Sequence, residues 1–244
     1  MWVIDKNSSV YVYDAGGTAL GSWTPIETFI SDDTAATWSA SYDLIGAKSR
    51  FSISRRGERV GQADWALLGR HNLENALAAL SSAVHAGVGI DIALEALSKF
   101  KGVKRRLDKR GVFKGITLYD DFAHHPTAIE TTLAAVRTQK AEQRIVAVIE
   151  LKSNSMRMGV HRDGMVKALS KADLVYILVS DDLNWKPESS FAAIGEKLTV
   201  SYDVDELLES LLGQLESSDQ VVLMSNSNFR GLPRLLQQAL KSSL

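Results

Sequence analysis

The second half of the chain alternates between short apolar runs and amphipathic segments. Apolar runs typical of buried strands occupy residues 112–120, 144–151, 174–179, 198–202 and 220–225. Segments with helical spacing of apolar residues lie between and after them, at residues 126–139, 164–172, 191–197, 204–215 and 231–242. Apolar strands separated by helices predict a mostly parallel sheet covered on both faces, which is a Rossmann-like α/β domain.

The first part of the chain has a strand-rich pattern. Strand-like segments fall at residues 10–13, 36–42, 50–55 and 63–68, and a turn-like sequence at 56–59 precedes the last of them. Two helices follow, at residues 72–85 and 92–100, and Asp91 is positioned to cap the second. The basic stretch 101–110 comes next, with Lys or Arg at six of its ten positions. We therefore expect a mixed sheet plus helices in residues 1–106 and the Rossmann-like domain in residues 107–244.

Composition narrows the classes of function. The 244 residues are 45% hydrophobic and 23% charged, which is ordinary for a globular protein, and the net charge of −1 gives no long-range attraction to nucleic acid or acidic membranes. The absence of cysteine excludes a disulfide framework and thiol catalysis. The sequence has neither a signal peptide at its start nor a run of roughly 20 apolar residues. These features favour a cytoplasmic enzyme without membrane insertion.

Residues 119–129 (YDDFAHHPTAI) concentrate the most chemistry in the chain. The apolar residues before them predict a strand, and Pro126 is typical of the first turn of a helix. Asp121, His124 and His125 are therefore expected at the carboxyl end of a strand, where open α/β sheets bind ligands. The alternative is structural, with Asp121 as a turn residue and the histidines as helix caps. No helix opens with G-x-G-x-x-G, so a dinucleotide site is not favoured.

Three segments together resemble the Mur ligases, the ATP-dependent amide-forming enzymes of peptidoglycan synthesis. The sequence DDFAHHPT resembles their second nucleotide-and-substrate motif, residues 68–76 (LGRHNLENA) resemble the G-x-H-N-x-x-N-A box, and residues 100–108 (FKGVKRRLD) resemble F-x-G-x-x-R-R-x-[ED]. Residues 151–159 (LKSNSMRMG) are similar to the S-N-T-M-K-M-G segment of one branch. That branch joins UDP-N-acetylmuramate to the recycled tripeptide L-Ala-γ-D-Glu-meso-diaminopimelate.

The resemblance implies the end of the family's central ATPase domain in residues 1–106 and its Rossmann-like C-terminal domain in residues 107–244. The family's P-loop, G-x-x-x-x-G-K-[ST], occurs nowhere in the sequence, and residues 46–49 (GAKS) lack its Gly-Lys step. The magnesium-holding glutamate and modified lysine of the family also belong to a part before this sequence. We therefore expect ATP and Mg²⁺ as cofactors of a longer ligase, no metal ligands in this sequence, and no catalysis by the chain alone.

The nucleotide would contact three segments by this resemblance. Asn72 and Asn75, which offer donors and acceptors, would lie beside the base, with His71 next to them at a helix amino end. Arg106 would reach the phosphates, and Asp121 would bond the ribose. The alternatives are an asparagine with a capping or buried structural role and a basic linker that is merely solvated.

The remaining candidates concern the two substrates to be joined. His124 or His125 is suited to act as the base that deprotonates the attacking amine, or equally to position substrate. Both would also be ligands if Asp121 held a metal, although further ligands are lacking. Lys152, Ser153, Asn154 and Arg157 supply cations and donors for the carboxylates of the tripeptide, with Arg157 at a position where the family has lysine.

Other departures and rivals stay open. Residues 225–231 (SNSNFRG) replace a glycine-richer S-N-G-G-F-G-G loop, which puts close backbone approach to substrate in doubt. His161 and Trp185 are expected to be surface and packing residues. The rival functions are a sister ligase that adds free L-alanine and a module that binds nucleotide or muropeptide without catalysis.

Overall fold

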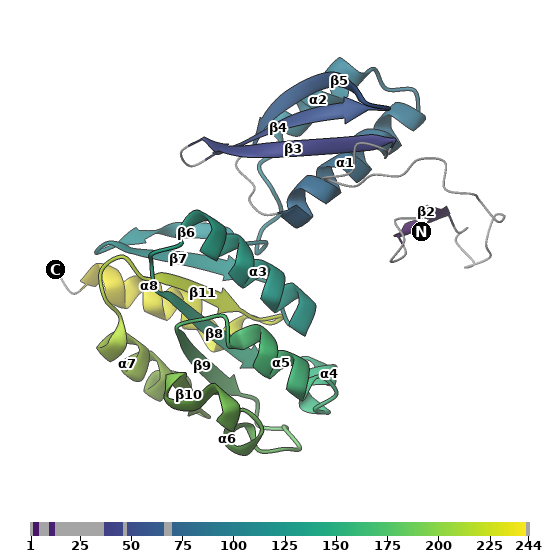
Figure 1. Cartoon of the computed structure of the whole chain (residues 1–244). Coiled ribbons are helices and arrows are strands. Elements are labelled where there is room, and N and C mark those ends of the chain that lie inside the picture. The colour runs from purple at the N-terminus through teal and green to yellow at the C-terminus, as the bar shows by residue number, and fades with distance from the viewer. Residues whose placement is uncertain (1, 5–9, 13–36, 46–47, 66–69, 243–244) are drawn as a thin grey trace. The chain divides into compact units, whose positions relative to one another are not determined.

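Two units divide the chain after Gly102. The computed structural model describes residues 2–4, 10–12, 37–45, 48–65 and 70–242, and its units are Met1–Gly102 and Val103–Leu244 (Figure 1). The division falls four residues before the expected boundary at residue 106. The reason is local, because Arg105 and Leu107 hydrogen-bond to groups at the ends of strands in the second unit.

The first unit combines antiparallel strands with two helices. Its elements are β1 (Trp2–Ile4), β2 (Val10–Val12), β3 (Trp38–Ile45), β4 (Lys48–Arg55), β5 (Glu58–Trp65), α1 (Arg70–His85) and α2 (Ile90–Lys99). Strands β3, β4 and β5 form one antiparallel sheet in that order, and β1 pairs with β2. Trp38, Phe51 and Ile53 of the sheet share a buried core with Leu77 of α1 and Leu94 of α2.

Two predictions for the first unit were wrong in detail. The last strand begins at Glu58 rather than at residue 63, because the chain reverses within two residues, Arg56 and Gly57, both with positive φ (52° and 81°). Residues 66–68 of the predicted strand lie outside the described residues. The second helix begins at Ile90 with Gly89 as its N-cap, so Asp91 lies in its first turn and does not cap it. An acidic residue there still interacts favourably with the positive end of the helix.

The second unit is built on a six-stranded mixed sheet. Its strands are β6 (Asp108–Phe113), β7 (Ile116–Asp121), β8 (Ile145–Leu151), β9 (Leu174–Val179), β10 (Leu198–Ser201) and β11 (Gln220–Met224). Its helices are α3 (Pro126–Gln139), α4 (Asn154–Arg157), α5 (Arg162–Leu169), α6 (Pro187–Ser190), η1 (Ala192–Lys197), α7 (Val204–Gln214), η2 (Phe229–Gly231) and α8 (Leu232–Ser242). The order is β10-β9-β8-β11-β7-β6, parallel except for β6. The predicted α/β class is confirmed.

The run 112–120, predicted as one strand, is instead a hairpin. Strands β6 and β7 pair antiparallel across a turn at Lys114 and Gly115, where φ is 52° and 82°. A side chain at Gly115 would also meet the Ser217 hydroxyl oxygen, 2.3 Å from an ideal Cβ. Glycine therefore fits this turn for two independent reasons.

Helices cover both faces of this sheet. Ile129 and Leu133 of α3 and Met165 of α5 pack on one face, whereas Leu207 of α7 and Leu236 of α8 pack on the other (Figure 1). The chain leaving β8 thus runs to the first face, and the chain leaving its neighbour β11 runs to the second. Such a divergence is the place where open α/β sheets bind ligands. Among the described residues, no helix is both long and apolar enough to cross a membrane.

Candidate functional site

The two richest sequence segments lie at one edge of the second sheet. Strands β7, β8 and β11 are parallel neighbours, so their carboxyl ends meet at the same edge. Asp121 ends β7, and Lys152 and Ser153 follow β8. The fold therefore brings the motif 119–129 and the loop 152–157 to one side of the unit, as open parallel sheets do with their ligand-binding residues.

Asp121 is a buried carboxyl group with partners from its own chain. Its Oδ2 accepts a hydrogen bond from the Leu107 N–H (2.5 Å), and its Oδ1 accepts from the Ala123 N–H (2.7 Å) and the Thr132 hydroxyl (3.3 Å). Burial raises the pKa of Asp121, while these bonds and the nearby Arg106 act to lower it. Asp121 thus fastens Leu107, within the basic stretch, to the end of β7, in addition to any ligand contact.

Arg105 and Arg106 face the same aromatic ring. Their guanidinium carbons lie 5.3 Å and 5.6 Å from the centre of the Phe122 ring, within the range of cation–π attraction. Arg105 also bonds to Asp120 (3.3 Å) and to the Ser225 carbonyl. Arg105 is therefore held at the sheet edge by hydrogen bonds, whereas the contact described for Arg106 is with the face of the Phe122 ring. Arg106 consequently suits a phosphate contact better than Arg105 does.

The two histidines of the motif are held in different ways. His124 Nδ1 lies 2.8 Å from the Phe122 carbonyl oxygen, which only accepts, so Nδ1 carries the proton and Nε2 is the basic nitrogen of neutral His124. His125 is the N-cap of α3, and its Nδ1 accepts from the Thr127 N–H at 3.4 Å. That contact places the proton of neutral His125 on Nε2.

A third histidine adjoins this pair. The ring of His161, just before α5, meets the ring of His125 edge to face with centres 4.5 Å apart. Burial lowers the pKa of His125, and the charges of His161 and His124 lower it further. His161 was expected to be a plain surface residue, but it is a neighbour of the motif 119–129. The two segments are far apart in the sequence, so the sequence alone does not indicate this contact.

The loop after β8 presents the predicted acceptor residues. Ser153 caps α4, accepting from the Met156 N–H at 3.3 Å, and this cap sets the direction of the short helix. Arg157, at the end of α4, bonds to Asn154 and to Asp182 of the next strand's loop. Lys152 is exposed, and its Nζ is 3.5 Å from the Ser180 hydroxyl. The loop 152–157 thus has a defined conformation and presents two cationic side chains, Lys152 and Arg157.

A buried acidic residue at this edge was missed by the sequence reasoning. Glu150 is 2% exposed, and its Oε2 accepts from the Ser225 and Ser227 hydroxyls, both at 2.5 Å. Those hydroxyl oxygens in turn accept from the N–H groups of Ser227 and Phe229. One acidic residue inside the apolar run IVAVIEL was the available signal, since buried carboxyl groups need partners.

The loop 225–231 is held in its conformation by hydrogen bonds of its own side chains. Ser227 bonds to Glu150, and Asn228 accepts from the Arg230 N–H. Arg230 itself has φ of 47°, a conformation that favours glycine, and its guanidinium bonds to the Tyr202 and Val179 carbonyl oxygens at 2.9 and 3.0 Å. Side-chain hydrogen bonds thus hold this loop at positions where the resemblance implies glycines.

The remaining nucleotide candidates belong to the first unit. His71, Asn72 and Asn75 all lie in the first two turns of α1, as expected for presentation at a helix amino end. Asn75 is exposed and borders an apolar cavity of about 370 Å³ between α1 and α2. Asn72 is half-buried. Their proposed contact with a nucleotide base stays a prediction.

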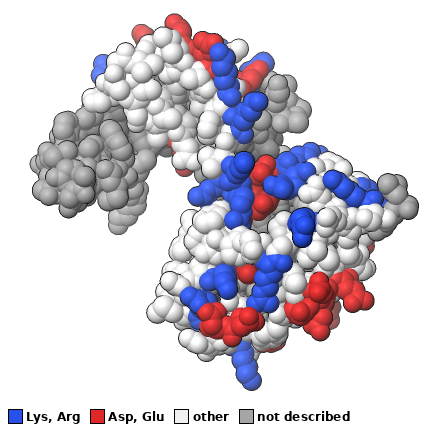
Figure 2. Space-filling model, turned by 180° about the vertical axis from the view of Figure 1, so that it is seen from behind, with Lys and Arg blue, Asp and Glu red and all other residues white. Residues whose placement is uncertain are grey.

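The distribution of charged side chains and of possible metal ligands bears on what the site could bind. Lys and Arg are interspersed with Asp and Glu over each unit on the face seen in Figure 2. Within the described residues, His, Asp and Glu form no cluster of three that would hold a metal ion. The residues described here therefore do not fit a metal site built from such side chains alone.

Comparisons with known proteins agree with this geometry. Residues 105–227 match the family model described as Mur ligase, glutamate ligase domain. This chain belongs to the Mur ligase family. The prediction of family membership is thereby confirmed, and the match runs from before β6 to the loop after β11, so it includes every strand of the second sheet.

Individual relatives narrow the branch. The chain is 37% identical over 224 residues to the UDP-N-acetylmuramate–L-alanyl-γ-D-glutamyl-meso-2,6-diaminoheptandioate ligase of Haemophilus influenzae, covering 91% of this chain and 49% of that protein. It is 32% identical over 213 residues to the UDP-N-acetylmuramate–L-alanine ligase of Acaryochloris marina, covering 80% and 43%. The crystal structure of a murein peptide ligase from Psychrobacter arcticus has a TM-score of 0.67 at 35% identity, covering 92% and 48%. The chain spans about half the length of these relatives.

Proposed function

We propose that this chain supplies the acceptor-peptide site and part of the nucleotide site of an ATP-dependent ligase. The reaction would join UDP-N-acetylmuramate to L-Ala-γ-D-Glu-meso-2,6-diaminoheptanedioate, a step of peptidoglycan recycling. The observation that carries the proposal is the ordered loop 152–157 at the sheet edge, in a chain 37% identical to a ligase of that description. The cytoplasmic location expected from the sequence stays a prediction.

The proposed chemistry has two steps. ATP transfers its γ-phosphoryl group to the lactyl carboxylate of UDP-N-acetylmuramate, which gives ADP and an acyl phosphate. The amine of the peptide's alanine then attacks the acyl carbon, phosphate leaves, and the amine loses a proton as the amide forms. The contribution of this chain would be to orient the amine and to stabilise phosphate oxygens with Arg106. Magnesium would stabilise the transferring phosphoryl group, and we assign its ligands to none of the described residues.

The two histidines are suited to different roles. Neutral His124 presents an unprotonated Nε2, since its Nδ1–H is bonded to the Phe122 carbonyl. His125 uses its Nδ1 to cap α3. We infer that His124 is the base of the pair and that His125 positions the start of the helix. Both assignments rest on hydrogen-bond partners, and a base needs an available lone pair.

The acceptor would be held by its carboxylates. Arg157 offers a planar fork, and Lys152 a point charge, to the D-glutamyl and diaminoheptanedioate carboxylates. Asn154 bonds to Arg157 and so keeps the guanidinium near the end of α4. Asp121 and Asn75 would contact the ribose and the base of the nucleotide, as the family resemblance implies.

Chemical-shift mapping tests this distribution of sites. The tripeptide, added to the ¹⁵N-labelled chain, should shift amide resonances of residues 152–158, and a non-hydrolysable ATP analogue should shift those of 120–125. Peptide-induced shifts confined to other parts of Val103–Leu244 would contradict the acceptor assignment. Shifts from free L-alanine at 152–158 would instead favour the L-alanine ligase, the second candidate, which the Acaryochloris relative supports.

A further inference from the structure

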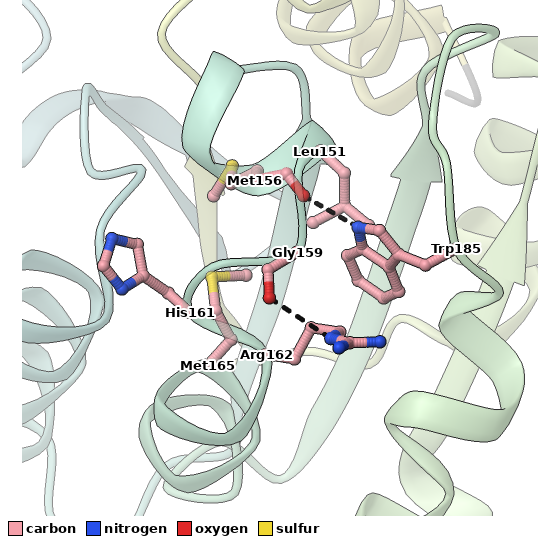
Figure 3. Close-up of a pocket in the computed structure, with 7 residues that line it drawn as sticks. All are labelled: Leu151, Met156, Gly159, His161, Arg162, Met165 and Trp185. Atoms are coloured by element: carbon pink, nitrogen blue, oxygen red, sulfur yellow. Dashed lines mark hydrogen bonds between the residues drawn. The ribbon is translucent and has the colours of Figure 1, made fainter.

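The loop after β9 is packed onto the proposed acceptor loop. The Trp185 indole N–H donates to the Met156 carbonyl oxygen at 2.8 Å (Figure 3). The Trp185 ring also meets the Phe191 ring edge to face, with 5.4 Å between centres. Residues 180–186 therefore hold α4 in place from outside its own loop. Trp185 is thus more than the plain packing residue that the sequence suggested.

This contact brings an acidic side chain beside Arg157. Asp182 forms an ion pair with the Arg157 guanidinium, and its other oxygen accepts from the Ser180 hydroxyl at 2.7 Å. Lys152 Nζ reaches the same hydroxyl at 3.5 Å. The Asp182 side chain is 52% exposed and that of Arg157 is 31% exposed, so a ligand in solvent has access to both charges.

An exposed ion pair of this kind adds little to stability, because solvent screens it and both side chains lose freedom. Its two charges are, however, complementary to a group that carries an ammonium and a carboxylate on one carbon. The distal end of 2,6-diaminoheptanedioate is such a group, whereas lysine has only the ammonium. A carboxylate would bind the guanidinium, and the adjacent ammonium would lie against the aspartate.

We propose that Asp182 is a specificity-determining residue that binds the distal ammonium of the acceptor while Arg157 binds the distal carboxylate. This inference rests on the proposed function and deepens it by stating which group at the distal end of the peptide each charged side chain binds. Ser180 fixes the Asp182 oxygen that faces away from Arg157, which leaves the carboxylate oriented when the ligand arrives. Pre-ordered partners lower the entropy cost of binding.

The neighbouring Asp181 provides a matched control. Its side chain is 91% exposed, and its described partner is Arg230, at 3.2 Å. Asp181→Asn removes the same charge from the same loop without touching Arg157. Any effect of Asp182→Asn that Asp181→Asn shares would reflect net charge alone.

Calorimetric titration of the 244-residue chain with three tripeptides tests the proposal. The peptides end in diaminoheptanedioate, in lysine, which lacks the distal carboxylate, or in 2-aminoheptanedioate, which lacks the distal ammonium. The unsubstituted chain should prefer the first peptide about tenfold over each of the others, as expected for one lost charge contact per peptide.

Asp182→Asn and Arg157→Gln should each remove one preference. Asp182→Asn should bring the first and third peptides to within about twofold, while keeping the discrimination against the lysine peptide. Arg157→Gln should bring the first and the lysine peptides close in affinity, while keeping the discrimination against the third peptide. Asp182→Glu should retain both preferences, and Asp181→Asn should match the unsubstituted chain. Circular dichroism of each variant establishes that it is folded.

Three results would overturn the proposal. Equal affinity of the unsubstituted chain for all three peptides would do so and leave the proposed function standing. An equal gain in affinity for every peptide in Asp182→Asn would mean that Asp182 only competes for Arg157. Silence from all three peptides would overturn the inference together with the acceptor assignment on which it rests.

Discussion

Loss of the Glu150 carboxylate should destabilise the carboxyl edge of the second sheet. In Glu150→Ala the Ser225 and Ser227 hydroxyls lose their common acceptor, at 2.5 Å each, in a position that is 2% exposed. A hydrogen bond to a charged group contributes about 1.5–3 kcal/mol, and part of two such bonds is recovered as the hydroxyls turn. We expect a loss of about 3 kcal/mol in the free energy of unfolding.

The amide variant separates charge from geometry. In Glu150→Gln the amide oxygen takes the place of Oε2 and keeps both serine bonds, at roughly half the strength of charge-assisted ones. The expected loss is therefore about 1–2 kcal/mol. Glu142→Gln is the control, because Glu142 is exposed and lies at the other end of β8. It should change stability by less than about 0.5 kcal/mol.

Urea unfolding provides the measurement. Trp185 is the sole tryptophan in residues 103–244, so 5-fluorotryptophan labelling gives a resonance that follows this unit separately from the other four tryptophans. The midpoint shift, with an unchanged m-value, gives the loss in stability. The reasoning fails if Glu150→Ala unfolds with the midpoint of the unsubstituted chain, or if the glutamine variant is as damaged as the alanine variant.

Four further predictions concern the motif and catalysis. Long-range ¹H–¹⁵N spectra above pH 7 should show His124 protonated on Nδ1 and His125 on Nε2; the opposite tautomers would contradict the assigned base. The lowered pKa of His125 means that the unfolded chain binds its proton first, so stability present above about pH 6.5 should decline as pH falls. His161→Phe should raise the pKa of His125 by NMR titration, because it removes a nearby charge but keeps the ring contact. The purified chain should release no phosphate from ATP, since its sequence has no P-loop, and measurable turnover would refute that expectation.

Local pattern sufficed for most of the second sheet. Strands β8, β9 and β11 were predicted to within about one residue at each end, and α3 was found over its full length, because apolar runs and Pro126 are strong local signals. The hairpin of β6 and β7 was missed although Lys114-Gly115 interrupts the run. An apolar stretch with a short break fits one strand or two, and only the antiparallel pairing decides between them.

Contacts between distant segments set the limit on predicting the site. The alternating pattern predicts parallel strands, and strand direction in turn predicts which segments reach the sheet edge. It does not predict which side chains become partners there. Glu150 meets Ser225 75 residues away, and Arg157 meets Asp182 from the neighbouring strand's loop. No spacing in the sequence encodes such pairs, because register and loop path determine them together.

The acceptor site on Val103–Leu244 is the central claim, and one titration tests it most directly. The chain is titrated calorimetrically with L-Ala-γ-D-Glu-meso-2,6-diaminoheptanedioate and, in parallel, with free L-alanine. Arg234→Ala, which removes an exposed arginine from α8 on the opposite face of the sheet, is the control for Arg157→Ala. We predict tripeptide binding that survives in Arg234→Ala, weakens at least tenfold in Arg157→Ala, and has no counterpart with alanine. Binding of alanine alone, or tripeptide binding indifferent to Arg157, would contradict the account.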